Sequence, residues 1–251
     1  MTVDPLAAVG FGSGADAYER SRPSYPAPAI DLLVRDLPIT SSSRVIDLAA
    51  GTGKLTRLVA TTGADVVAVE PSPAMREQFA RTQPGIPVLD GTAEAIPAAD
   101  GSVDAVLVAQ AFHWFDHPRA LAEFVRVLVP GGGLGIIRNE RDESVPWVRE
   151  MSEVMHWTTE SPSLHDADFA AIIERDSDAF EPVAHSSFPF TQELTRDGVV
   201  ERAATSSYIV AMDVPTRDAL LGRLRAVVAE LPEPVQLPYV TDVYVTHRRP
   251  S

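Results

Sequence analysis

The chain has 251 residues, which fits one large domain or a core domain carrying a smaller insertion, and its content of 45% hydrophobic and 22% charged residues is typical of a soluble globular protein. Its net charge of −14 disfavours binding to nucleic acid and to anionic lipid, because no run of basic residues offsets the repulsion. The absence of cysteine excludes disulfides, thiolate metal sites and cysteine nucleophiles.

The N-terminal residues show neither a secretory signal nor the pattern of a core helix. They lack a basic segment followed by an apolar one, and no later apolar run reaches the roughly 18 residues of a membrane-spanning helix. We therefore expect a cytoplasmic protein without membrane association. The stretch AYERSRPSYP, residues 17–26, is polar and aromatic, and it holds Tyr18, Arg22 and Tyr25.

Five short segments between residues 44 and 139 have the Val- and Ile-rich composition of buried strands. Helical patterns separate them: one ends at Gly63, one begins with Ser72 as its N-cap and Pro73 in its first turn, and one, HPRALAEFVRVLVPGG, is closed by Pro130 and glycines. Strands alternating with helices predict a parallel sheet with helices on both faces. The predicted strands are residues 44–49, 65–70, 86–91, 103–110 and 133–139.

The remainder of the chain has a different pattern. Residues 142–178 are polar and helical in character, without strand alternation. A strand is predicted over 184–194, helices over 196–210 and 216–231, and a final strand over 237–248. The alternating Tyr, Val and Thr of that last segment suit an antiparallel edge or penultimate strand. We expect 142–178 and 196–231 to form a helical lid over the top of the sheet.

The segment IDLAAGTGKLT, residues 46–56, has the character of a nucleotide-binding loop between a strand and a helix. An ATP-binding P-loop needs glycine at position 48 and a hydroxyl at position 55, and Leu48 and Leu55 occupy those positions. A dinucleotide loop needs glycine at position 56, where Thr56 stands, and Asp47 places a carboxylate where pyrophosphate would bind. ATP is therefore rejected, whereas a dinucleotide is disfavoured but open.

S-adenosylmethionine (SAM) meets fewer objections at the same loop. It has no phosphates, and its sulfonium and ammonium groups tolerate the carboxylate of Asp47. Glu70 ends the next predicted strand, a place from which an acid can accept hydrogen bonds from ribose hydroxyls. The alternative is that Asp47 and Glu70 only cap the ends of their strands.

Four stretches together resemble the successive motifs of the class I SAM-dependent methyltransferases over about residues 40–140. They are VIDLAAGTGKLT, VVAVEPSPAMREQF, DGTAEAIPAADGSVDAVLVAQAFHWFD and RVLVPGGGLGII. The N-terminal AYERSRPSYP is similar to that of small-molecule methyltransferases related to trans-aconitate methyltransferase. The resemblance implies an α/β, Rossmann-like fold whose seven-stranded sheet is mostly parallel with an antiparallel C-terminal strand. It also implies a single domain over 1–251 with residues 1–40 as an N-terminal cap, in a monomer or homodimer.

The resemblance further implies which residues bind the cofactor. Two of them depart from the family pattern: Ala49 replaces a glycine, which fits if its φ is negative, and Thr92 replaces an aspartate, so that the backbone would contact the adenine there. The implied cofactor-binding residues are Tyr18, Arg22, Asp47, Ala49, Gly51, Gly53, Glu70, Pro71, Met75, Thr92, Ala93, Glu94, Gln110 and Ala111.

Residues 110–117, QAFHWFDH, follow the fourth predicted strand and are expected beside the sulfonium. Methyl transfer needs alignment of the reactants and, for some acceptors, removal of one proton. His113 is the candidate general base, with orientation of the loop as the alternative role. The cluster of His165, Asp166 and Asp168 lacks a second histidine at ligand spacing, so no metal site is predicted. Candidate substrate residues are Tyr25, Trp114, Trp147, His156 and Trp157.

The acceptor is constrained mainly by a missing motif. Families that methylate nucleic-acid or protein amide nitrogen carry an Asn/Asp-Pro-Pro-Phe/Tyr type motif after the fourth strand, where this chain has AQAFHWF. The expected function is therefore methyl transfer from SAM to an oxygen of a small molecule, a hydroxyl or carboxylate, with release of S-adenosylhomocysteine (SAH). Carbon and amine acceptors stay open. The alternatives are a SAM-binding protein without transfer and an NAD(P)-dependent oxidoreductase, the latter disfavoured by Thr56 and by the absence of a Tyr-x-x-x-Lys pair.

Overall fold

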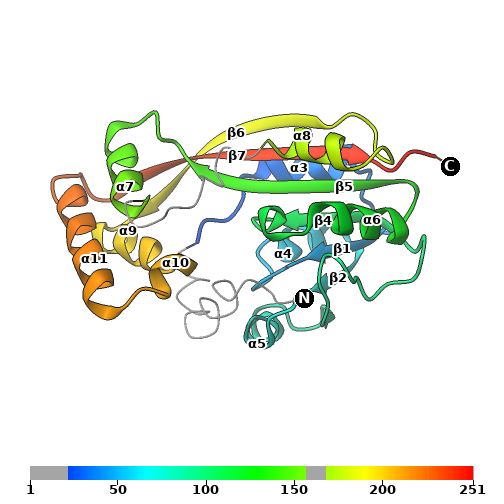
Figure 1. Ribbon diagram of the computed structural model, residues 1–251, viewed down its shortest axis with the longest axis horizontal. Helices are drawn as coiled ribbons and strands as arrows, with labels where there is room; N and C mark the ends of the chain where they lie inside the picture. Colours follow the sequence, from blue (N-terminus) through cyan, green and yellow to red (C-terminus); the bar gives the residue numbers. More distant parts are fainter. Residues whose placement is uncertain (1–21, 157–167, 251) are drawn as a thin grey trace. The chain divides into compact units, whose positions relative to one another are not determined.

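The computed structural model describes residues 22–156 and 168–250. Its strands form one seven-stranded sheet in the order β3-β2-β1-β4-β5-β7-β6 (Figure 1). The strands are β1 (Arg44–Leu48), β2 (Asp65–Val69), β3 (Val88–Leu89), β4 (Val103–Ala109), β5 (Leu128–Arg141), β6 (Ala184–Leu194) and β7 (Val235–His247). The helices are α3 (Ala27–Asp36), α4 (Thr56–Val59), η1 (Ala60–Thr62), α5 (Pro73–Thr82), η2 (Phe112–Trp114), α6 (His117–Val127), α7 (Pro146–His156), α8 (Phe169–Asp176), α9 (Arg196–Ala204), α10 (Ser207–Val210) and α11 (Val214–Val228).

The pairing of the strands confirms the predicted sheet. β1 pairs in parallel with β2 and β4, β2 pairs in parallel with β3, and β4 with β5. The neighbour of β5 is antiparallel, since Gly131 donates to the carbonyl of Arg248 while Asp142 donates to that of Pro238, both at 3.0 Å. β7 is the penultimate strand, one of the two positions that its alternating pattern predicted, and β6 forms the edge.

The residues of the central strands alternate between two buried clusters, which places helices on both faces of the sheet. Val106 and Val108 of β4 pack with side chains from α6 and α8, such as Phe124. Ala105 and Leu107 of the same strand belong to the other cluster, which contains side chains from α3 and α4. This two-sided burial explains why these strands have near-continuous apolar sequences.

The chain separates into two compact units, and the division falls within β5, β6 and β7. In the described part, unit 1 comprises residues 22–23, 140–156 and 189–240, and unit 2 comprises 24–139, 168–188 and 241–250. The prediction of one domain with a cap and a lid stays a prediction.

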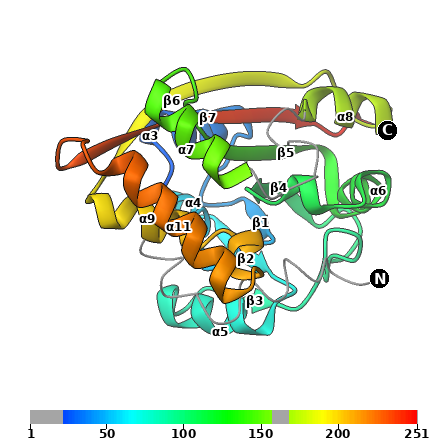
Figure 2. The ribbon, with the colours of Figure 1, turned by 60° about the vertical axis from the view of Figure 1, so that its left-hand side comes forward.

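Unit 1 has a hydrophobic core of its own. Its helices α7, α9, α10 and α11 contribute side chains to one buried cluster together with the first residues of β7 (Figure 1). The helix α11 packs against both α7 and α9 (Figure 2). In the described ranges, no helix is long and apolar enough to cross a membrane.

Several predicted boundaries were wrong. The third helix predicted from the sequence corresponds to α6, and it ends at Val127 instead of at Pro130. Leu128 already pairs with Val103, and the residue before a proline favours an extended backbone. The predicted helix over 196–210 is two helices, and at the break the hydroxyl of Thr205 donates to the carbonyl of Arg202 at 2.8 Å.

Other boundaries were confirmed. The strand over 184–194 has the predicted bounds. Ser72 is the N-cap of α5, where its hydroxyl accepts a hydrogen bond from the Met75 amide, and Pro73 is in the first turn. Gly63 ends η1 in the left-handed conformation, with φ of 82°.

Candidate functional site

The loop between β1 and α4 turns sharply at Ala49, whose φ is 54°. The expectation of a negative φ at this residue was therefore wrong. The turn lets the Ala50 amide donate to the carbonyl of Val69 at the end of β2, at 3.2 Å. A left-handed alanine costs about 1–2 kcal/mol, and such strain is concentrated at functional sites.

Asp47 lies in β1 with 1% of its surface exposed. Its Oδ2 accepts a hydrogen bond from the hydroxyl of Thr56, at the start of α4. Its Oδ1 is buried without a partner among the described residues. Burial raises the pKa of Asp47 to about 7, the Thr56 hydrogen bonds oppose the rise, and the nearby Glu70 adds to it. Asp47 is thus a buried acid with one oxygen available to a donor or cation.

Glu70 immediately follows β2 and holds the loop with both carboxylate oxygens. Oε2 accepts a hydrogen bond from the Gly51 amide at 2.9 Å, and Oε1 accepts one from the Ser72 amide at 2.8 Å. Burial raises the pKa of Glu70, whereas these amides and Arg76 act in the opposite direction. Because each carboxylate oxygen has two lone pairs, Glu70 retains acceptor capacity for a ligand.

The residues after Glu70 are fixed by Arg76 of α5. Its Nη1 donates to the carbonyls of Glu70 and Pro71, at 2.7 and 2.9 Å, and to the Asp90 carboxylate at 2.9 Å. Met75, the neighbouring residue on the helix, is 2% exposed. Pro71 and Met75 therefore lie close to Glu70 along the chain, and their predicted contact with adenine stays a prediction.

The two glycines of the loop have different surroundings, although both have positive φ. A Cβ on Gly51 would meet nothing within 4 Å, so this residue borders open space. A Cβ on Gly53 would lie 2.7 Å from Gln83 and 2.8 Å from Phe79, both on or just after α5. Gly53 therefore allows the loop to pack on α5, whereas Gly51 leaves room beside the backbone.

The segment after β3 holds the predicted adenine-edge residues Thr92, Ala93 and Glu94. Thr92 and Ala95 close a tight turn with reciprocal backbone hydrogen bonds of 3.3 and 3.2 Å. Ala93 is buried, and the Glu94 carboxylate accepts a hydrogen bond from the Asp116 amide at 3.0 Å. Glu94 thereby connects this turn to the segment after β4.

The segment after β4 begins at Gln110, another residue with positive φ, 59°. The Gln110 side chain donates to the carbonyl of Asn139 at 3.3 Å, and Ala111 is buried. His113 lies in η2 with its ring 4.7 Å from that of Trp114, which is 39% exposed. The carboxyl ends of β1, β2 and β4 thus carry the predicted loops of unit 2, as the switch-point rule for open α/β sheets requires.

The remaining predicted site residues lie in both units or outside the described part, and their roles stay predictions. Tyr25 packs against the buried cluster of α3 and α4 in unit 2. Arg22 belongs to unit 1, where its guanidinium donates to the carbonyl of Thr205 at 3.3 Å. Trp147 packs in the core of the same unit. Tyr18 and Trp157 lie outside the described residues, and only the backbone of His156, the last residue of α7, is described.

The acidic cluster near residue 168 has a structural role in its described part. Asp168 caps α8 by accepting hydrogen bonds from the amides of Ala170 and Ala171, at 3.0 and 3.2 Å. His165 and Asp166 lie outside the described residues. Within 22–156 and 168–250, no group of three His, Asp or Glu side chains could hold a metal ion.

Sequence reasoning missed three residues that support the site. Thr56, considered only as a missing glycine, orients the Asp47 carboxylate. Arg76 binds the carbonyls after β2. Arg126 of α6 donates to the carbonyls of Ile96 and Ala98, at 3.0 and 2.8 Å, and so fixes the segment after β3. Only Thr56 had a usable signal, a hydroxyl residue at the start of the helix that follows the strand of Asp47.

Comparison with known proteins gives consistent matches. Residues 46–136 match a family described as a methyltransferase domain. An uncharacterized methyltransferase of Mycobacterium tuberculosis is 42% identical over 238 residues, 93% of each chain. A proposed type II methyltransferase from Anaeromyxobacter dehalogenans has a TM-score of 0.64 at 20% identity, covering 91% of this chain and 97% of its own. Haemonchus contortus phosphoethanolamine N-methyltransferase 2, solved with phosphomonomethylethanolamine and SAH, has a TM-score of 0.56 at 15% identity, covering 96% and 58% respectively.

Proposed function

Since this chain belongs to the class I SAM-dependent methyltransferases, we propose that it binds SAM at the loops after β1 and β2 and transfers the methyl group to an oxygen of a small molecule. The proposal rests above all on the unpartnered Oδ1 of Asp47. A buried polar atom without a partner is costly, so a donor from a ligand would stabilise it. The ammonium group of SAM is such a donor, and its positive charge suits an acid.

The remaining groups around the loop also suit SAM. The free lone pairs of Glu70 can accept hydrogen bonds from ribose hydroxyls while its amide contacts hold the loop in place. The space beside Gly51 allows a ligand to approach the backbone. A pyrophosphate would be repelled by the carboxylate of Asp47, which further disfavours a dinucleotide.

In this arrangement the chain supplies binding and alignment. SAM carries a methyl group that its sulfonium already activates for displacement. Asp47, Glu70 and the strained backbone at Ala49 and Gln110 would hold the donor in one orientation, and alignment alone accounts for much of the acceleration of such reactions. His113 would accept a proton from a hydroxyl acceptor, a step that a carboxylate acceptor does not need.

An oxygen acceptor on a small molecule is supported by charge and by sequence. The net charge of −14 opposes binding to nucleic acid. The segment AQAFHWF lacks the Asn/Asp-Pro-Pro sequence expected in enzymes that methylate nucleic-acid or protein amide nitrogen. These observations favour a hydroxyl or carboxylate as the methyl acceptor.

Titration calorimetry with SAH tests the cofactor site through Glu70. Glu70→Gln places an amide NH₂ where the carboxylate now accepts a hydrogen bond from a backbone amide, so that backbone amide loses its acceptor. An unsatisfied buried donor costs about 1–3 kcal/mol, and we therefore expect SAH to bind at least about tenfold more weakly. Glu77→Gln, an exposed substitution on α5, is the matched control and should bind as the wild type does. Equal affinity in both variants would remove Glu70 from the site.

A further inference from the structure

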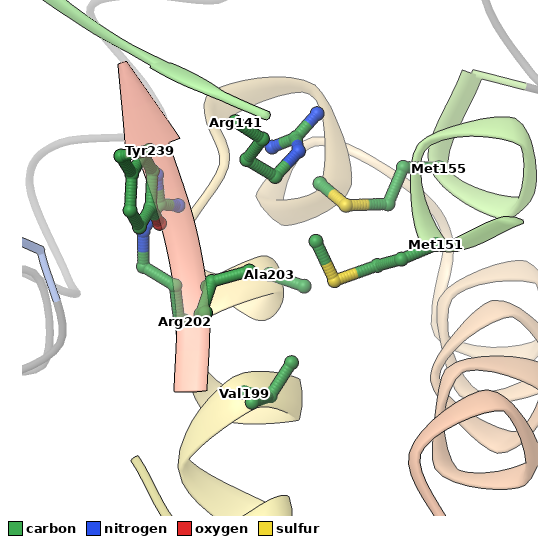
Figure 3. A pocket seen from close by; sticks show the side chains of 8 residues that line it. Arg141, Met151, Met155, Val199, Arg202, Ala203 and Tyr239 are labelled. Carbon is green, nitrogen blue, oxygen red and sulfur yellow. The ribbon is translucent and has the colours of Figure 1, made fainter. Parts of the chain in front are cut away.

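Two arginines share a hollow that is lined by residues of unit 1. Arg141 ends β5, and Arg202 lies on α9. The hollow holds about 190 Å³ of empty space, part of it open to solvent, and is lined also by Met151, Met155 and Tyr239. Figure 3 shows the two methionine side chains extending from α7 toward Arg141.

Among the described residues, neither guanidinium group forms an ion pair with a carboxylate. Burial lowers the pKa of Arg141, and the positive charge of Arg202 lowers it further. Tyr239, Tyr208 and Glu140 raise the pKa of Arg141, and each of the two tyrosines raises it more than Glu140 does. Arg202 takes part in no ion pair within the described part of the chain. Placing like charges together in a poorly hydrated site is destabilising unless an opposite charge joins them.

Hydrogen bonding in the hollow is also incomplete. Arg202 is 8% exposed, and its Nε has no partner among the described residues. The hydroxyl of Tyr239, a residue 1% exposed, also lacks a partner there. Among the described residues, Arg141 makes one side-chain hydrogen bond, from Nε to the Ser152 hydroxyl at 3.1 Å, which leaves its other donors for a ligand. Buried donors are normally satisfied, so these orphaned atoms indicate that a ligand accepts hydrogen bonds from them.

The rest of the lining is apolar and adaptable. Ala203 and Leu237 join the two methionines around the charged groups. The hollow is too narrow to admit a ligand without movement of its side chains. Methionine has three rotatable bonds and fills irregular gaps, so Met151 and Met155 are suited to move aside and then pack on an apolar ligand.

We propose that this hollow binds the carboxylate of a small organic acid, with Arg141, Arg202 and the Tyr239 hydroxyl as donors and the methionines against its apolar part. A guanidinium matches the two oxygens of a carboxylate in a fork, which a neutral or cationic ligand could not use. Inorganic phosphate, more highly charged and without an apolar part, fits the lining less well. That the acid is a methyl acceptor rests on the proposed function.

The test is a thermal shift experiment on the full chain with hexanoate, hexanamide and inorganic phosphate at equal ionic strength. Hexanoate should raise the Tm by about 3 °C once its concentration is tenfold above Kd. Hexanamide, which has the same shape without the charge, should give no shift. A shift with hexanamide equal to that with hexanoate, or a shift with phosphate alone, would overturn the proposal.

Substitutions locate the effect. Arg202→Met should abolish the hexanoate shift while leaving the Tm of the ligand-free protein equal or higher, because it removes an uncompensated buried charge. Arg202→Lys keeps the charge but loses the fork, so its shift should be smaller. Arg225→Met, an exposed change on α11, is the control and should respond as the wild type. A large fall in the ligand-free Tm of Arg202→Met would assign Arg202 a structural role and contradict the proposal.

A parallel titration with SAH separates this inference from the proposed function. Binding of SAH without any hexanoate shift refutes only the carboxylate site. A hexanoate shift that disappears in Arg202→Met, in a protein that does not bind SAH, supports the carboxylate site and refutes the proposed function.

Discussion

Asp47 is the residue on which the account of the site depends most. Its carboxylate is buried, is held on one side by Thr56 and has one oxygen without a partner among the described residues. The raised pKa, about 7, means that the folded chain without ligand retains a proton at pH values where the unfolded chain has released it. Its contribution to stability is therefore present at low pH and lost as the pH rises from about 4 to about 7.

The same titration predicts how ligand affinity depends on pH. A bound ammonium group favours ionised Asp47, so SAH should bind about tenfold more weakly at pH 6 than at pH 8, in proportion to the ionised fraction. Calorimetry at a series of pH values measures this dependence. Asp47→Asn should bind weakly and with a much flatter pH profile. An unchanged profile in that variant would assign the dependence to another group.

His113 is predicted to act on protons and not on the cofactor. His113→Asn preserves the size of the side chain but removes the base, so kcat for a hydroxyl acceptor should fall about 100-fold or more. The Kd for SAH should change less than about twofold, as calorimetry would show. With a carboxylate acceptor the variant should keep most of its activity, and equal losses with both acceptors would indicate that His113 only positions the loop.

Ala49 tests whether strain is stored beside the cofactor site. Ala49→Gly removes the cost of the left-handed alanine, about 1–2 kcal/mol, but gives the unfolded chain more conformational entropy, worth about 0.5–1 kcal/mol. We expect a net gain of about 0.5–1 kcal/mol in the free energy of unfolding, measured by urea denaturation. A loss of stability would mean that the methyl group of Ala49 packs favourably.

Among the elements, the loop after β1 and helix α5 act as one packed pair. Gly53→Ala puts a Cβ against Phe79 and Gln83 in addition to straining the backbone, whereas Gly51→Ala only strains it. We expect a loss of about 1 kcal/mol of unfolding free energy for Gly51→Ala and about 2–4 kcal/mol for Gly53→Ala. Urea denaturation of both variants measures the difference, and equal losses would contradict the packing role of Gly53.

The elements that were predicted best from the sequence are those whose residue pattern is determined by burial. The strands around Ile46, Val67 and Val106 have continuous apolar sequences because both of their faces are covered, so their positions could be predicted. The start of β5 could not be predicted, since Pro130 and three glycines resemble a helix end and a loop. Leu128 and Gly133 pair with β4, and Gly131 and Gly132 form hydrogen bonds with Arg248, which makes this stretch a strand. Tertiary hydrogen bonding decided that boundary.

The site was predictable to the extent that it lies at strand ends. Asp47 and Glu70 were identified by their places after apolar segments. The left-handed backbone of Ala49 and Gln110 was not, because alanine and glutamine carry no preference for that conformation. The amide contacts of Glu70 and the carbonyl contacts of Arg76 depend on how α5 meets β2, which residue spacing alone does not encode.

At the scale of the molecule, each compact unit is assembled from segments far apart in the chain. In its described part, unit 1 joins residues 140–156 with residues 189–240. The sequence patterns predicted helices and strand residues in these segments but did not indicate that the segments share a hydrophobic core. The proximity of Arg141 and Arg202 could not be predicted either, because 61 positions separate them in the sequence (202 − 141). Only packing in that core brings both side chains to the lining of one hollow.

The central claim is that the whole molecule transfers a methyl group from SAM to an oxygen of a small molecule. The most direct test incubates the enzyme with SAM labelled with deuterium in its methyl group and a panel of small hydroxyl compounds and carboxylic acids, followed by mass spectrometry. The account predicts a labelled ether or ester and an equal amount of SAH, both strongly reduced in Glu70→Gln when SAM is kept below its Kd. Label found on nitrogen or carbon, or no SAH with any acceptor, would contradict it.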